Sequence, residues 1–321
     1  MLLVVSTYAA SVYPTTQWAF TEGKANEPST ILTYSLQSPL DGVKFDFINE
    51  TSYQWWYFDV VSYDLLSSIT VTFNIGSNMG SSSASEIPTY VSVDGKLPNG
   101  ELFSISAIPA MNITVNTVGQ GSSSLWEGSG SSCSWNGTPD LSTYKVTIAA
   151  PEYGIQGSII INSVSPAEYP DYLASQQFYN VSELVAPNYG WANVIPGAQA
   201  IVDITINNSQ VAFQGSGYHD TDWGTIPLED FLEIEYWGHA QVGDWTVVFW
   251  LTELQSHDTS SQIYIAEGPT PLTLSDVTIT PITEGDYPDG TILLGTDTGY
   301  AGRYEFILVP ESITASIGSE L

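Results

Sequence analysis

Residues 68–75 read Ser-Ile-Thr-Val-Thr-Phe-Asn-Ile, with polar or small residues alternating with apolar ones. A period of two is typical of a strand with one buried face. Outward from this stretch, similar segments rich in β-branched and aromatic residues recur along the chain, at 90–93, 102–108, 144–149, 157–161, 200–206, 232–236, 245–251, 262–265 and 303–308. Helical periodicity is confined to 172–179 and 227–231, so the sequence predicts an all-β fold.

Turn-forming residues separate these segments. Asp94-Gly95 and Pro98-Asn99-Gly100 are the expected hairpin turns. The Ser/Gly-rich stretches 78–86 and 119–137 are expected to form exposed loops. A segment between Val185 and Gly197 combines prolines and glycines, and it predicts a boundary between two β-domains, 18–190 and 191–321.

The composition excludes several classes of function. The chain has 35 acidic residues and 5 basic ones, a formal net charge of -30. Such a protein repels phosphate backbones and anionic headgroups, so neither nucleic acid nor a membrane surface is an expected partner. No run approaches the roughly 20 apolar residues that a membrane-spanning helix needs, so membrane insertion is not expected either. The 10 tryptophans and 19 tyrosines argue against a disordered acidic protein.

Cys133 is the only cysteine, which excludes a disulfide within the chain and a cysteine-based metal site. Residues 1–11 resemble the end of an apolar signal segment, so residues 1–17 are interpreted as a signal-peptide remnant with an N-terminal extension. Five glycosylation sequons support the secretory pathway, or secretion, as the location, and they begin at Asn49, Asn112, Asn136, Asn180 and Asn207. The sequence leaves the oligomeric state open.

The first segment with chemical potential is Ser52-Tyr-Gln-Trp-Trp-Tyr-Phe-Asp59. On a strand, Trp55 and Tyr57 point to one face, while Trp56 and Phe58 point to the other. One face can line a ligand cavity while the other packs the core. The alternative interpretation is a central strand buried on both faces.

The second segment is Gly215-Ser-Gly-Tyr-His-Asp-Thr-Asp-Trp-Gly224, interpreted as a tight turn bracketed by glycines. An imidazole beside carboxylates can transfer a proton near neutral pH, and a tyrosine hydroxyl can polarise a carbonyl. Alternatively, His219 and Asp220 merely satisfy buried backbone groups. The histidines at 219, 239 and 257 match no short zinc motif, so no metal is expected.

Together, Trp-Trp-Tyr-Phe-Asp at 55–59 and Gly-Tyr-His-Asp-x-x-Trp-Gly at 217–224 resemble the hydroxyneurosporene-synthase-like family, which includes carotenoid hydratases and fungal Diels–Alderases. The resemblance runs from about Phe45 to Phe306. It implies two lipocalin-like antiparallel β-barrel or sandwich domains with a ligand pocket at or near their junction. At positions 221 and 222 this chain has Thr and Asp, where many relatives have other polar residues, including His or Asn.

The resemblance implies catalytic roles for Tyr218, His219 and Asp220. It implies substrate contacts for Trp55, Trp56, Tyr57, Asp59 and Trp223, and the following segment adds Glu235 and Trp237 as candidates. The expected reaction is a stereoselective Diels–Alder or hetero-Diels–Alder cyclisation of an apolar polyketide or terpenoid substrate, with or without a preceding dehydration to a quinone methide. It needs no cofactor, because the gain comes from proximity, orientation and one hydrogen-bond donor.

Two other functions stay open. A hydratase or dehydratase acting on a terpenoid or carotenoid-like alkene would need a buried, protonated carboxyl, for which Asp59, Asp220, Asp222, Glu233 and Glu235 are candidates. A non-catalytic carrier of an apolar ligand would need only the container.

Overall fold

The computed structural model of the chain describes residues 17–21, 39–45, 51–76, 89–167, 183–272, 274–281, 304–310 and 315–319. Within these ranges every regular element is a β-strand except two short 3-10 helices, η2 (Pro151–Tyr153) and η3 (Leu228–Asp230). The all-β prediction is therefore confirmed, and η3 falls in the predicted helical segment 227–231. The strands form three antiparallel sheets.

The largest sheet has thirteen strands in the order β1-β6-β7-β8-β9-β10-β12-β13-β2-β3-β4-β5, with β11 paired to β12. Their bounds are β1 (Gln17–Thr21), β2 (Tyr53–Ser62), β3 (Ser68–Gly76), β4 (Thr89–Lys96), β5 (Leu102–Pro109), β6 (Asn112–Val118), β7 (Gly121–Gly128), β8 (Ser131–Gly137), β9 (Thr143–Ala150), β10 (Ile155–Ser163), β11 (Leu184–Ala186), β12 (Tyr189–Ile206) and β13 (Ser209–Gly224).

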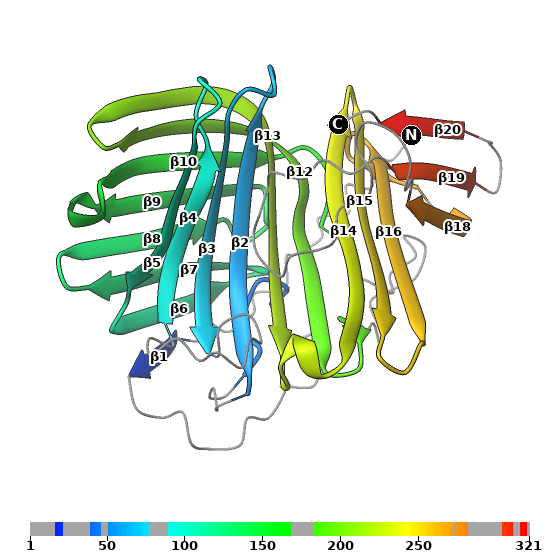
Figure 1. Cartoon of the computed structure of the whole chain (residues 1–321), viewed down its shortest axis with the longest axis horizontal. Helices are drawn as coiled ribbons and strands as arrows, with labels where there is room; N and C mark the ends of the chain where they lie inside the picture. Colours follow the sequence, from blue (N-terminus) through cyan, green and yellow to red (C-terminus); the bar gives the residue numbers. More distant parts are fainter. Residues whose placement is uncertain are drawn as a thin grey trace, which may run out of the picture.

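This sheet curls into a half-barrel. Figure 1 shows β6–β10 running across the direction of β2–β5, with β12 and β13 joining the two parts. The pairing explains the junction, because Ala198–Ile206 of β12 pairs with β10, whereas Gly215–Gly224 of β13 pairs with β2. Register shifts between Ala192 and Ala198 mark irregularities in the long β12–β13 pair, and such bulges bend and twist a strand.

The concave interior holds the main core, which includes Trp56, Phe58, Phe73, Trp126 and Trp135. The prediction of an exposed loop over 119–137 is wrong, because β7 and β8 occupy it. Their inward residues alternate strictly and are all buried: Ser122, Ser124 and Trp126 on β7, and Ser131, Cys133 and Trp135 on β8. The small serines leave room for the tryptophan indoles. Because serine is polar, the sequence did not show the alternation of apolar and polar residues that is typical of a strand.

The two hairpin-turn predictions had opposite outcomes. The turn at 98–100 is confirmed, with Gly100 at a φ of 86°. Asp94-Gly95 instead lies inside β4, so that prediction is wrong. A Cβ on Gly95 would collide with the Ser68 carbonyl oxygen of β3, so close backbone approach explains the glycine. The segments 78–86 and 172–179, Arg303, and residues 1–16 of the N-terminal extension lie outside the described residues.

Two smaller sheets follow. The first contains β14 (Leu232–Val242), β15 (Trp245–Leu254), β16 (Thr259–Glu267) and β17 (Thr270–Pro271), and the second contains β18 (Leu274–Pro281), β19 (Tyr304–Pro310) and β20 (Ala315–Ser319). The four-stranded sheet packs on the outer face of the large one, where Trp55, Tyr189 and Trp191 share a second core with Trp250. The fold is thus a half-barrel with a small sheet packed against it. The antiparallel all-β architecture agrees with the prediction, but the structure has a half-barrel and a small sheet where two lipocalin-like barrels or sandwiches were expected.

β12 runs through residue 190, where the sequence suggested a domain boundary, and it stays hydrogen-bonded in the large sheet on both sides of that point. The chain passes to the four-stranded sheet after Gly224. No helix in the described ranges has the length and hydropathy to cross a membrane.

Candidate functional site

Because side chains alternate along a strand, each of the two sequence motifs presents residues on both faces of the large sheet. On β2, Trp55, Tyr57 and Asp59 face the four-stranded sheet, while Trp56 and Phe58 enter the half-barrel. On β13, which pairs with β2, alternate residues divide in the same way. The side chains that meet between the sheets are called the inter-sheet site, and they are Tyr57, Asp59, Trp191, Tyr218, Asp220, Asp222, Glu235, Trp237 and His239.

Two carboxylates organise the hydrogen bonds of this site. The Asp59 Oδ2 atom accepts a bond from the Tyr57 hydroxyl at 2.9 Å and lies 2.7 Å from His239 Nε2. The Asp220 Oδ2 atom accepts from the Tyr218 hydroxyl at 2.7 Å and from Trp191 Nε1 at 2.9 Å. Among the described residues, the Asp59 Oδ1 atom is buried without a hydrogen-bond partner, whereas Asp220 also shares a side-chain hydrogen bond with Asp222. The site therefore presents an unused acceptor on Asp59 and a hydrogen-bonded pair of carboxyl groups at Asp220 and Asp222.

The acids of the site differ in their affinity for protons. Burial raises the pKa of Glu235 to about 8, and the nearby charge of Asp220 adds to the effect. Burial also raises the pKa of Asp220 to about 6, against the lowering effect of the Tyr218 and Trp191 hydrogen bonds. The pKa of Asp222 is raised well above its ordinary value by burial and by the charges of Asp220 and Glu235. Near neutral pH, Glu235 is thus a protonated acid beside an ionised Asp220, a division typical of acid–base sites.

His239 joins the two sheets electrostatically. Burial disfavours its charged form, but the Asp59 charge and hydrogen bond outweigh burial, and the net effect raises the pKa of His239. The contact with Asp59 therefore favours the charged imidazolium form of His239. Within the described ranges, no cluster of three or more His, Cys, Asp or Glu side chains has the arrangement of a metal site.

Aromatic rings enclose these polar groups. The Trp237 ring meets Tyr57 and Tyr218 edge-on, with ring centres 5.5 Å and 5.3 Å apart. Tyr218 stacks on His239 at 4.4 Å, and Trp191 packs against Trp250 at 5.2 Å. Such walls provide dry surroundings in which one proton donor has a large effect, and their faces attract positive charge.

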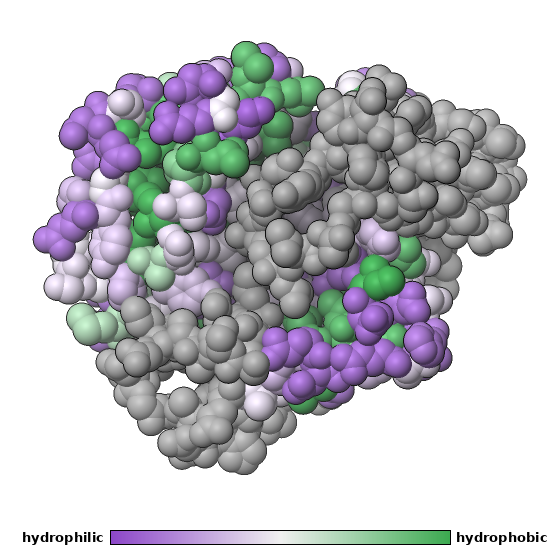
Figure 2. Space-filling view, in the orientation of Figure 1, coloured by the Kyte–Doolittle hydropathy of each residue, from purple (hydrophilic) through white to green (hydrophobic). Residues whose placement is uncertain are grey.

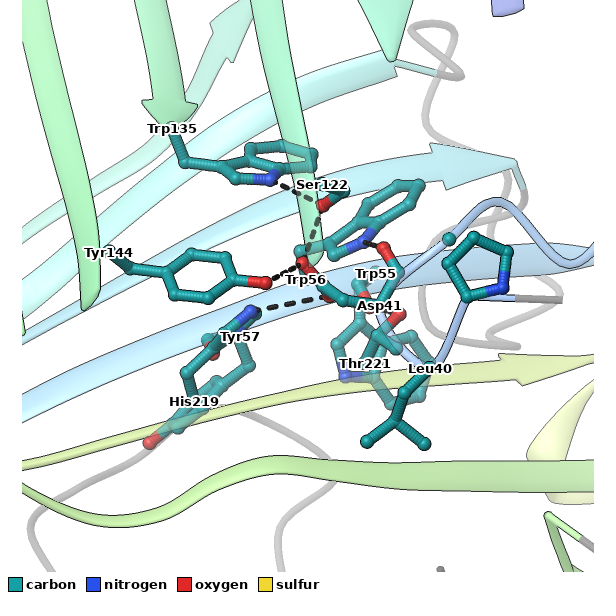
Figure 3. Close-up of polar contacts among 12 residues, drawn as sticks. Leu40, Asp41, Trp55, Trp56, Tyr57, Ser122, Trp135, Tyr144, His219 and Thr221 are labelled. Atoms are coloured by element: carbon teal, nitrogen blue, oxygen red, sulfur yellow. Dashed lines mark hydrogen bonds and ion pairs between the residues drawn. The ribbon is translucent and has the colours of Figure 1, made fainter. Parts of the chain in front are cut away.

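His219 lies on the opposite face of β13 from Tyr218 and Asp220. Figure 3 shows its imidazole directed at Asp41 inside the half-barrel, with Nε2 3.3 Å from the Asp41 Oδ1 atom. Its Nδ1 is 2.9 Å from the Tyr57 carbonyl oxygen, an acceptor, so Nδ1 carries a hydrogen. The other Asp41 oxygen accepts from the Ser122 and Tyr144 hydroxyls. The predicted trio is therefore divided between two faces, with His219 fully buried.

The remaining predicted residues divide in the same way. Trp56 packs against Trp135 in the main core, and the Trp223 ring lies 4.7 Å from the Lys44 ammonium on the inner face. Trp55, Tyr57, Asp59, Glu235 and Trp237 lie on the outer side, so the structure brings them together with Tyr218 and Asp220. Their roles toward a substrate stay predictions.

Trp191 and His239 were not predicted from the sequence as site residues. Trp191 donates to Asp220 from β12, and no local motif marks it. His239 had a signal, because Glu235, Trp237 and His239 alternate along β14 and so share one face.

Comparisons with known proteins agree with this architecture. The family model described as "Diels-Alderase-like" matches residues 17–280. The quinolone epoxide rearrangement protein asqO of Emericella nidulans is 34% identical over 227 residues, 70% of this chain and 60% of that protein. The quinolone epoxide rearrangement protein penF of Penicillium thymicola is 34% identical over 228 residues, 70% of this chain and 62% of that protein. The chain thus spans about 60% of the length of these two relatives.

Relatives at lower identity include Diels-Alderases. The Diels-Alderase cheD of Chaetomium globosum is 26% identical over 205 residues, 64% of this chain and 47% of that protein. The crystal structure of CghA with Sch210972 shares the fold, with a TM-score of 0.69 at 18% identity over 91% of this chain and 82% of that one. The matched region 17–280 carries every strand of the half-barrel and the whole inter-sheet site, and on that match this chain belongs to the Diels-Alderase-like family.

Proposed function

We propose that this protein is a cofactor-independent isomerase that rearranges an oxygenated, largely apolar secondary metabolite at the inter-sheet site. The observation that carries the proposal is Glu235, an acid protonated near neutral pH because it lies in an aromatic, acidic enclosure. A general acid of this kind speeds proton transfer to oxygen by about 10²–10⁴-fold.

An epoxide is the substrate group that suits this arrangement. The Glu235 carboxyl donates its proton to the epoxide oxygen as one C–O bond opens, and positive charge develops on the released carbon. The faces of Tyr57 and Trp237 stabilise that charge. A neighbouring group migrates with its electron pair, and a proton returns to Glu235 or Asp220, so the product is an isomer. The names of asqO and penF support this choice of reaction.

A Diels–Alder or hetero-Diels–Alder cyclisation of a polyketide or terpenoid substrate is the second candidate. The aromatic walls can fold such a substrate, and Glu235 can donate a hydrogen bond to a conjugated carbonyl without losing its proton. The family name and cheD support it.

The substitution Glu235→Gln separates the two reactions. A glutamine still donates a hydrogen bond but cannot transfer a proton. Rearrangement of an aryl epoxide is therefore expected to slow by about 10²-fold or more, whereas a cycloaddition should slow far less. Glu233→Gln is the matched control, because Glu233 is exposed on the same strand. Equal rates for both variants on an epoxide would remove proton transfer by Glu235 from the mechanism.

Mass spectrometry of the metabolites that the producing organism makes with and without the gene tests the reaction class. Loss of the gene should cause an isomer of the final product to accumulate. A precursor that differs by one water would support a hydratase or a dehydration-coupled cyclisation instead. An unchanged profile would favour a carrier and would contradict both proposals.

We also propose that the protein enters the secretory pathway and carries N-linked glycans. Asn112, Asn136 and Asn207 are exposed, as acceptors must be, while Asn49 and Asn180 lie outside the described residues. A fall in mass on glycosidase treatment of the native protein supports the proposal, and an unchanged mass contradicts it.

A further inference from the structure

The charges of the inter-sheet site already have partners within it. Asp59 is paired with His239, whose Nε2 atom lies 2.7 Å away. Asp220 shares a hydrogen bond with Asp222 and interacts with the charge of His239. Burial, with the Asp220 charge, raises the pKa of Glu235 to about 8, so Glu235 keeps its proton near neutral pH. The site therefore favours an uncharged ligand over an ammonium or a carboxylate.

An acceptor and a donor of this site are both buried without a hydrogen-bond partner in the part of the chain that the structure describes. The acceptor is the Asp59 Oδ1 atom on β2, in a residue that is 4% exposed. The donor is the Trp237 Nε1 atom on β14, in the facing sheet, and this atom is buried although the residue is partly exposed. Native proteins satisfy the large majority of buried polar side-chain atoms, so the two atoms indicate where a ligand forms hydrogen bonds.

Both atoms belong to side chains that contact Tyr57. The Tyr57 hydroxyl donates to the other Asp59 oxygen at 2.9 Å, and the ring centres of Tyr57 and Trp237 are 5.5 Å apart. Tyr218 and His239 contact the Trp237 ring as well, with ring centres 5.3 Å and 5.6 Å away. The indole cannot rotate without losing these contacts, so its N–H is oriented before a ligand arrives.

The chemical class of the ligand follows from the need to satisfy both atoms. A hydrocarbon would satisfy neither, and a ketone, ether or ester would accept from Trp237 but leave the Asp59 Oδ1 atom unpaired. A secondary amide carries an N–H and a carbonyl oxygen on opposite sides of one rigid, planar group. Such a group suits an acceptor on one sheet and a donor on the facing sheet, whereas a hydroxyl must form both bonds at a single oxygen.

We propose that the inter-sheet site binds the secondary amide group of an otherwise apolar ligand. The amide N–H donates to the Asp59 Oδ1 atom, and the amide oxygen accepts from Trp237 Nε1. The inference rests on the proposed function for the place of the site and deepens it, because the amide holds the substrate while the reacting group meets Glu235. It narrows the substrate class from oxygenated apolar metabolites to those that carry an amide, with Asp59 and Trp237 as the residues that determine specificity.

Three probes with one skeleton test the amide. N-methylbenzamide donates and accepts, propiophenone has a CH₂ in place of the N–H and only accepts, and 1-phenylpropan-1-ol donates and accepts at one oxygen. Binding to the intact protein is followed by ligand-observed NMR and by tryptophan fluorescence. N-methylbenzamide is expected to bind more tightly than either analogue by about five-fold or more, because hydrogen bonds to carboxylate oxygens are stronger than neutral ones. An affinity of propiophenone or of the alcohol that equals or exceeds that of the amide would overturn the inference.

Two variants assign the hydrogen bonds to atoms. In Asp59→Asn, the Tyr57 hydroxyl and His239 retain the side-chain oxygen as their acceptor, so an NH₂ donor replaces the Oδ1 atom. The preference for N-methylbenzamide over propiophenone should then disappear, with the affinity of propiophenone unchanged. Trp237→Phe keeps an aromatic ring but removes the N–H, and it should weaken both probes by the same factor of about three or more. It remains a test if Asp59→Asn fails to fold, and unchanged affinities would contradict the inference.

Matched controls separate these effects from bulk charge and from loss of an indole in general. Asp244→Asn removes a carboxylate that is exposed in the β14–β15 turn. Trp126→Phe removes an indole N–H that is also buried without a partner among the described residues, but in the half-barrel core. Neither control should change the affinity of N-methylbenzamide. A loss as large as that in Asp59→Asn or Trp237→Phe would show that the effect is not local, which would contradict the inference.

The outcome of these binding experiments is independent of catalysis. If N-methylbenzamide binds as expected but no epoxide rearranges, the substrate class stands and the proposed reaction fails. If an epoxide without an amide rearranges while N-methylbenzamide shows no preference over propiophenone, the reaction stands and the inference fails.

Discussion

At the residue scale, the central feature is a carboxyl that keeps its proton. Glu235 extends from β14 into the inter-sheet site beside Asp220, and burial together with that neighbour raises the pKa of Glu235 to about 8. Retaining the proton avoids a second charge beside Asp220 in a half-buried position, and the benefit has a pH dependence that can be measured.

Glu235→Gln should stabilise the protein at high pH. The folded state holds the Glu235 proton up to about pH 8, whereas an unfolded glutamate releases it near its ordinary value of 4.5. Between these values the folded state binds more protons, so stability falls as pH rises, and glutamine does not titrate. The variant should melt above wild type near pH 8, with a gap that shrinks toward pH 4.5. A gap that is constant with pH would contradict this reading.

His219→Gln should damage stability, because His219 faces Asp41 within the main core. Removing the imidazole takes away the polar group nearest the Asp41 Oδ1 atom and the donor to the Tyr57 carbonyl oxygen, and leaving a buried polar group unsatisfied costs about 1–3 kcal/mol. Denaturant unfolding measures the cost. His257→Gln is the control, since the His257 side chain is 82% exposed. Adding Asp41→Asn to His219→Gln should recover part of the loss, and strict additivity would show that the two side chains are not coupled.

At the element scale, the sequence predicted β2 correctly and β13 incorrectly. The alternation of Trp55 and Tyr57 with Trp56 and Phe58 was visible because both sets are aromatic. On β13, Gly215, Gly217 and Gly224 suggested a turn, but Gly215 and Gly224 lie where a side chain would strike the neighbouring strand β2. The surroundings of His219 could not be predicted, since Asp41 and the Ser122 and Tyr144 hydroxyls that donate to Asp41 come from distant parts of the chain.

Gly215→Ala tests this interpretation of the glycines. A Cβ at residue 215 would collide with the Val61 carbonyl oxygen on β2, so the two strands must separate locally. We expect a loss of about 1–3 kcal/mol in the free energy of unfolding. Gly243→Asn is the control, because Gly243 has open space around it and a φ of 60°, which asparagine tolerates. An unchanged free energy of unfolding in Gly215→Ala would mean that β2 and β13 can move apart locally at little cost.

At the scale of the whole molecule, charge dominates the behaviour in solution. The net charge of -30 is carried on a surface where hydrophilic side chains cover much of the visible described face (Figure 2). Repulsion among like charges keeps such a protein soluble but opposes its compact state.

Salt should therefore raise the melting temperature near neutral pH. At about 0.1 M ionic strength the screening length is about 10 Å, which weakens repulsion between surface carboxylates. Thermal melts across a sodium chloride series measure the effect. The control is the same series near the isoelectric point of about 4.1, where the effect should vanish. Destabilisation by salt at neutral pH would show that favourable ion pairs outweigh the repulsion.

The division of β2 and β13 into two faces has a consequence for how new activities can arise. Positions 55, 57 and 59 on one strand and 218, 220 and 222 on the other face the four-stranded sheet, so changes there act on the smaller core between the sheets and leave the half-barrel core in place. Evolution can thus explore catalytic chemistry on one side of a ribbon while the reverse side preserves foldability. A combinatorial library restricted to those six codons should retain far more folded members than one of equal size built on 56, 58, 219, 221 and 223.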